Sequence, residues 1–70
     1  MSEYEKIIYA IRKAMKAKKV KCADIGALLG LGREMVNQKL NGHRKFYFWE
    51  IIEICEYLGL ELTISEKTPT

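Results

Sequence analysis

The fold of this chain is decided between Cys22 and Asn41, where the sequence reads CADIGALLGLGREMVNQKLN. Two short helices that cross closely need a small residue where their backbones meet, and Gly26 stands at that place. Gly30 permits the positive φ that a tight turn after the first helix requires, and Leu31 can fill the space beneath the turn. The apolar residues expected to join one core from both helices are Ile25, Leu29, Val36 and Leu40. The pattern predicts a helix-turn-helix.

Hydrophobic periodicity predicts two more helices around this motif. Apolar residues recur at three- and four-residue spacing over residues 3–18, which is typical of an amphipathic helix with one side on a core. A similar pattern covers residues 48–58, preceded by an apolar Phe46 that we also expect inside. The residues of this last helix expected to face the core are Phe48, Ile51, Ile52, Cys55 and Leu58. The residues expected on its solvent side are Glu50, Glu53 and Glu56.

After Gly59 the apolar period changes to two, which predicts a strand. The expected elements are helices over residues 3–18, 22–29, 33–41 and 48–58, a strand over residues 60–65 and a frayed tail over residues 66–70. A chain of 70 residues has room for one core only. We therefore predict one all-α domain over residues 1–65, with four to five helices and a short C-terminal strand.

Charge is distributed unevenly along the chain. Between Arg12 and Lys45 there are ten basic and two acidic residues, a net charge of +8. From Phe46 onward five acidic residues face one lysine, a net charge of −4. A solvated surface is the plain explanation of most charge runs, but a segregation this strong within one small domain favours a polyanionic partner such as nucleic acid.

The sequence argues against several other classes of protein. No window is apolar enough for a membrane span and the first residues are polar, so we expect a cytoplasmic location. The two cysteines, Cys22 and Cys55, have neither a metal-ligand nor a disulfide-framework spacing, so we expect reduced thiols and no metal. His43 is the single histidine, and no phosphate loop or nucleophile with a base partner is recognisable, so we expect neither an enzyme nor a cofactor.

Two stretches carry a resemblance to a known family. They are IGALLGLGR at residues 25–33 and KLNG at residues 39–42, and the similarity runs from the first helix to Leu60. In them the chain resembles the lambda-repressor-like family, also called the Xre or Cro/CI type of helix-turn-helix regulators. The stretch QKLNGHRKF at residues 38–46 resembles in particular small phage or prophage regulators of Gram-positive bacteria. The resemblance implies a lambda-repressor-like domain that binds double-stranded DNA sequence-specifically and regulates transcription, in particular as a repressor.

Family members read bases in the major groove with the exposed side of the third helix. By position, the base-reading residues here are Arg33, Glu34, Asn37 and Gln38. Their chemistry suits this role, because arginine pairs with guanine, asparagine or glutamine pairs with adenine, and glutamate accepts a hydrogen bond from cytosine. The alternative is that these residues form only a solvated helix face, on which Glu34 is stabilised by the positive end of the helix dipole.

The resemblance also implies phosphate contacts from the start of the second helix and from the loop after the third. The residues expected to make them are Lys21, Cys22, Asn41, His43, Arg44 and Lys45. Cys22 stands where the family usually has a glutamine, and Lys21 stands where a capping serine or threonine is common. Lys39 occupies a position that is often apolar in the family, so we expect Leu40 to take over its packing.

A homodimer is the expected assembly, because two reading helices about 34 Å apart fit a palindromic operator. The residues expected at the dimer interface are Trp49, Leu60, Leu62 and Ile64. The C-terminal strand either pairs with its counterpart across the two-fold axis, as in the antitoxin branch of the family, or lies on its own domain. The alternative function is an antitoxin or adaptor that binds a protein partner, a toxin or an anti-repressor, and binds DNA only to regulate its own expression.

Overall fold

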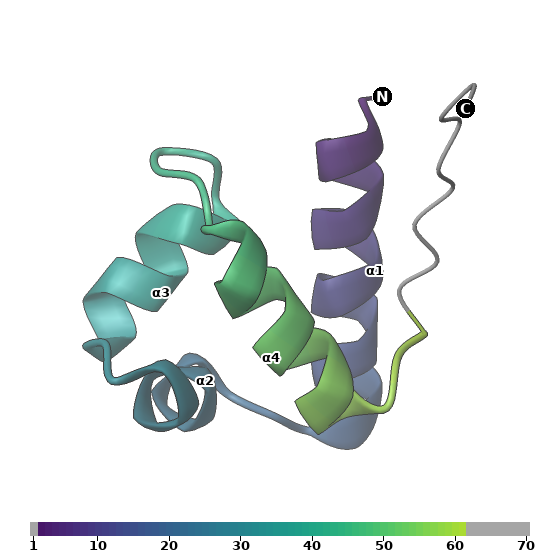
Figure 1. The fold of residues 1–70 in the computed structure, drawn as a ribbon. Coiled ribbons are helices and arrows are strands. Elements are labelled where there is room, and N and C mark those ends of the chain that lie inside the picture. Colours follow the sequence, from purple (N-terminus) through teal and green to yellow (C-terminus); the bar gives the residue numbers. More distant parts are fainter. Residues whose placement is uncertain (1, 62–70) are drawn as a thin grey trace.

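The computed structural model describes residues 2–61, over which the chain forms four α-helices (Figure 1). They are α1 (Glu3–Lys18), α2 (Cys22–Leu29), α3 (Arg33–Leu40) and α4 (Phe48–Leu58). The described part contains no strand, so the all-α prediction is confirmed for it. The helix predicted over residues 33–41 ends one residue earlier, and Asn41 caps it.

The strand predicted over residues 60–65 is not seen at the two of its residues that the structure describes. Leu60 and Glu61 have no strand conformation. Residues 62–65, like the tail predicted over residues 66–70, lie outside the described residues. Leu60 packs partly buried against the core of its own domain, and its backbone N–H donates to the Cys55 carbonyl at 2.8 Å.

Local capping explains where α1 and α2 begin and end. Ser2 and Glu5 form a capping box at the start of α1, with reciprocal hydrogen bonds of 2.9 and 3.1 Å. The start of α2 has only half of this arrangement, because the Asp24 carboxylate accepts the N–H of Lys21 at 2.9 Å while Lys21 offers no side-chain acceptor. Gly30 ends α2 with φ at +74°, in the left-handed region.

The core draws side chains from all four helices and from the loop before α4. The residues that form it are Ile8, Ile11, Met15, Ile25, Leu29, Val36, Leu40, Phe46, Ile51, Ile54, Cys55 and Leu58. Helix α4 packs against both α1 and α2, and α2 packs against α3. In Figure 1, α4 lies between α3 and α1. Arg33, Glu34 and Asn37 of α3 remain exposed in this arrangement.

Gly26 lies in α2 against the backbone of the turn between α2 and α3, whereas the sequence analysis expected the backbone of the second helix there. A Cβ atom at this position would stand 2.5 Å from the carbonyl oxygen of Leu31. The Leu31 N–H donates to the Gly26 carbonyl at 2.8 Å, a bond of the kind that also follows α1 and α4. Leu31 itself is partly buried against the core. The absence of a side chain at Gly26 therefore allows α3 to start close to α2.

The predicted orientation of α4 is wrong at Phe48, Glu50 and Ile52. Ile52, expected in the core, is only half-buried and lies outside the core cluster. Phe48, expected in the core, is 61% exposed, while Ile54 is fully buried. Glu50, expected in water, is 2% exposed. The reason is that Phe46 already fills the core at this end of the helix, and that a partner on α3 neutralises the Glu50 carboxylate.

Candidate nucleic-acid interface

Helix α3 turns one polar face away from the core, which we call the outward face of α3. It consists of Arg33, Glu34, Asn37 and Gln38. The first three are exposed and Gln38 is half-buried. Val36 and Leu40 are buried, and Glu34 and Gln38 lie opposite them around the helix. Arg33 is exposed because it stands at the first position of α3. The four residues predicted to read bases are therefore together on one accessible surface.

Hydrogen bonds hold the C-terminal half of this face in place. Asn41 donates from Nδ2 to Oδ1 of Asn37 at 3.3 Å. Arg44 donates from Nε to Oε1 of Gln38 at 3.2 Å. Asn41 and Arg44, which are predicted to contact phosphates, thus each bond to a residue that is predicted to read bases.

Arg12 on α1 contributes to the site, although the sequence analysis did not select it. Its Nη1 donates to the Leu40 carbonyl and to Oδ1 of Asn41, both at 3.3 Å. A cation at the C-terminal end of a helix is stabilised by the helix dipole. Arg12 and Leu40 are 28 residues apart, so no local spacing pointed to this contact, and the only signal was the excess of basic residues on α1.

Cys22 connects α2 to the outward face of α3. It is half-buried and lines two adjoining hollows, one with Arg33, Glu34 and Asn37 and the other with residues that include Arg12, Asn37 and Asn41. Lys21, immediately before it, is exposed. The start of α2 therefore borders the same surface as α3, where the sequence places a phosphate contact.

The α3–α4 loop, residues 41–47, carries the remaining predicted phosphate contacts. Asn41, His43, Arg44 and Lys45 are all exposed on it. The loop is fastened to α1, since the Phe46 N–H donates to the Tyr4 hydroxyl at 2.9 Å and the Lys45 ammonium lies 5.5 Å from the centre of the Tyr4 ring. Backbone and basic side chains of the loop are thus held beside the end of α3.

A buried ion pair, which the sequence analysis missed, joins α3 to α4. Lys39 Nζ lies 2.8 Å from Oε1 of Glu50, and the two residues are 6% and 2% exposed. The same oxygen accepts the backbone N–H of Tyr47 at 2.8 Å. Lys39 also lies over the rings of Phe46 and Tyr47, at 5.6 and 5.1 Å from their centres. The pair therefore fixes both ends of the α3–α4 loop.

The residues predicted at a dimer interface are only partly described. Trp49 is exposed at the start of α4. Leu60 packs against its own core, and Leu62 and Ile64 lie outside the described residues. No cluster of three or more metal-binding side chains occurs in residues 2–61, and none of the helices there is long and apolar enough to cross a membrane.

The two thiols differ in environment, which predicts a difference in reactivity. Cys55 is buried in the core, and burial raises the pKa of its thiol, whereas Cys22 is half-buried at the surface of α2. Since the thiolate is the reactive form, a pulse of iodoacetamide at pH 8 is expected to modify Cys22 and leave Cys55 unmodified. Mass spectrometry of peptides from the native protein and from the protein unfolded in guanidinium measures both sites. Equal modification of the two thiols in the native protein would contradict the prediction.

Comparison of the chain with models of known protein families, with curated proteins and with solved structures found no match.

Proposed function

We propose that this protein is a sequence-specific regulator that binds double-stranded DNA, with α3 in the major groove. The observation that carries the proposal is the outward face of α3, where four side chains able to bond base edges stand together on an accessible helix. A major groove about 12 Å wide admits one α-helix. The proposal includes a lambda-repressor-like fold, on the resemblance of the chain to that family.

The surroundings of α3 support the proposal. Basic side chains border the outward face on the α1 side through Arg12 and on the loop side through Arg44 and Lys45. Cations on both flanks of a reading helix suit the two phosphate backbones that border a groove. The net charge of +8 between Arg12 and Lys45 adds a long-range attraction for DNA.

The regulator is proposed to act in the cytoplasm as a homodimer on a palindromic operator. The dimer would place two copies of α3 about one helical turn of DNA apart, roughly 34 Å. Occupation of such an operator over a promoter represses transcription without any chemistry at the site.

Selection of bound sequences from random double-stranded DNA tests the function directly. We expect the purified protein to enrich a palindromic sequence at moderate salt. Failure of any sequence to enrich above random DNA would overturn the proposed function. Binding to all sequences with one affinity would leave only the electrostatic attraction and would equally contradict sequence-specific reading.

Two alanine variants on the selected operator separate base reading from phosphate binding. Arg33→Ala is expected to cost about 1–3 kcal/mol and to relax the preference at one base position. Lys45→Ala is expected to weaken binding to all sequences alike. It should lower the slope of log K against log salt by about 0.9 for each protomer, and so by about 1.8 for the dimer. Fluorescence anisotropy with the operator and its single-base variants, at several salt concentrations, measures both effects. Equal losses on every sequence for both variants would contradict the division of roles.

A further inference from the structure

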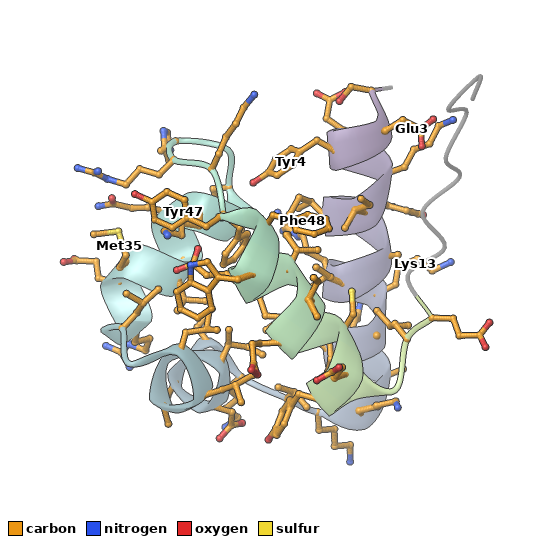
Figure 2. The ribbon with its side chains drawn as sticks, in the orientation of Figure 1. Glu3, Tyr4, Lys13, Met35, Tyr47 and Phe48 are labelled. Carbon is orange, nitrogen blue, oxygen red and sulfur yellow. The ribbon has the colours of Figure 1, made fainter. Side chains whose placement is uncertain are left out.

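A groove lies between α3 and the start of α4, next to the loop that carries the proposed phosphate contacts. Its apolar lining includes Leu31 from the turn, Met35 from α3 and Trp49 from α4, and Arg44 and Lys45 line it as well. Tyr47 and Trp49 are 67% and 54% exposed. Figure 2 shows Met35 and Tyr47 near one another beside α3, on the side of the molecule away from α1. Large aromatic side chains exposed beside one another are typical of a binding surface.

The charge of this groove is one-sided. Its one acidic lining residue, Glu50, is buried and paired with Lys39 at 2.8 Å. Arg44 and Lys45 are exposed and have no carboxylate within ion-pair distance among the described residues. An apolar lining with unneutralised cations is complementary to a ligand that combines apolar side chains with carboxylates.

We propose that the groove binds an acidic amphipathic segment of a partner protein. Apolar side chains of the segment pack between Met35 and Trp49, and its carboxylates pair with Arg44 and Lys45. The aliphatic and thioether part of the lining, which Leu31 and Met35 provide, suits leucine-like side chains better than the flat faces of nucleic-acid bases. A protein segment is therefore favoured over single-stranded nucleic acid.

Binding at this groove opposes DNA binding, an effect that rests on the proposed function. Arg44 donates to Gln38 on the outward face of α3, so a carboxylate that draws Arg44 away changes that face. Arg44 and Lys45 are also proposed phosphate contacts. A side chain that pairs with a carboxylate of the partner is not free to pair with a DNA phosphate. An acidic partner segment thus competes with the operator and relieves repression.

Trp49 provides a direct readout, because it is the only tryptophan of the chain and lines the groove. The probe is a synthetic helical peptide with leucine and phenylalanine on one face and glutamate on the other. We expect this peptide to shift the Trp49 emission to shorter wavelength and to protect it from acrylamide quenching. A peptide with lysine in place of every glutamate is expected to do neither.

A matched pair of charge reversals locates the binding site. Lys45 and Lys13 are both exposed lysines near a tyrosine ring, at 5.5 and 5.4 Å from its centre. Lys45→Glu is expected to weaken peptide binding about tenfold, whereas Lys13→Glu, remote from the groove, is expected to leave it unchanged. Equal weakening by both reversals would show that net charge alone attracts the peptide and would overturn the proposal.

The remaining outcomes separate this inference from the DNA-binding proposal. The emission change is measured without DNA, so it supports the groove even if no operator is selected. An emission change with an oligothymidine in place of the peptide, a change with protein concentration alone, or no change with the peptide would each overturn the proposed occupant. Addition of the peptide to the complex of the protein with its operator is expected to release the DNA. If the peptide binds in the groove and the DNA stays bound, the proposed competition between partner and operator is wrong.

Discussion

Replacement of Glu50 by leucine is expected to lower the free energy of unfolding by about 3–5 kcal/mol, because the Lys39 ammonium then stays buried without a counter-charge. The carboxylate stands 2.8 Å from that ammonium in a region that water hardly reaches. A domain of 70 residues has a total stability of roughly 4–10 kcal/mol. The variant should therefore be close to unfolding at room temperature, which urea denaturation followed by circular dichroism measures.

The double variant Lys39→Met with Glu50→Leu is expected to recover most of this loss. A buried ion pair replaced by apolar side chains of similar size is often neutral in stability, since the desolvation of both charges is avoided. The part not recovered is the hydrogen bond from the Tyr47 N–H to Oε1 of Glu50, worth about 1 kcal/mol. A double variant no more stable than Glu50→Leu would contradict the assignment of the loss to the unpaired lysine.

An exposed ion pair in the same chain serves as the control. Glu3 and Lys6 are 3.7 Å apart on the surface of α1. Glu3→Gln is expected to change stability by a small fraction of the loss at Glu50, because water screens the exposed pair. If both single variants lost the same stability, burial would not be the cause.

The helix pattern of this chain was predictable from the sequence because its signals are local. The limits of α1, α2 and α4 follow from apolar periodicity and from glycines at the turns, such as Gly30 and Gly59 with φ of +74° each. Periodicity accounts for the outward position of Glu34 and Gln38, which lie opposite Val36 and Leu40 around α3. Arg33 lies on the same side as Val36 and is exposed because it stands at the first position of the helix. Elements and faces of this kind depend only on neighbours within one or two turns.

The predictions that failed concern contacts between separate elements. The spacing of the three glutamates of α4 places them on one apparent solvent side, and nothing local distinguishes Glu50 from the other two. Its burial depends on Lys39, 11 residues earlier on another helix. Phe46 and Phe48 are equally apolar, and only the path of the loop decides that Phe46 enters the core and Phe48 stays exposed. Packing between separate elements decides which of several similar residues is buried, and the apolar periodicity of one helix contains no information on that packing.

The second large effect is expected at Gly26, where alanine should lower the free energy of unfolding by about 1–3 kcal/mol. In an exposed helix, alanine in place of glycine stabilises by about 1 kcal/mol, because it restricts the unfolded chain and is the better helix former. Here the added Cβ would stand 2.5 Å from the backbone oxygen of Leu31, which cannot rotate away. The clash must be relieved by moving the turn and the start of α3, so steric overlap outweighs helix propensity.

Gly32 provides the control for this substitution, because nothing lies within 4 Å of a Cβ atom built there. Gly32 is the N-cap of α3, where serine is at least as favourable as glycine. Gly32→Ser should therefore leave the free energy of unfolding unchanged or raise it, whereas Gly26→Ala should lower it. Urea denaturation of both variants measures the difference.

Under the proposed function Gly26→Ala should also weaken operator binding beyond its loss of folded protein, because α3 is displaced. A Gly26→Ala variant as stable as the parent chain would show that α2 and α3 can separate at no cost, and that the close approach at Gly26 does not determine the position of α3.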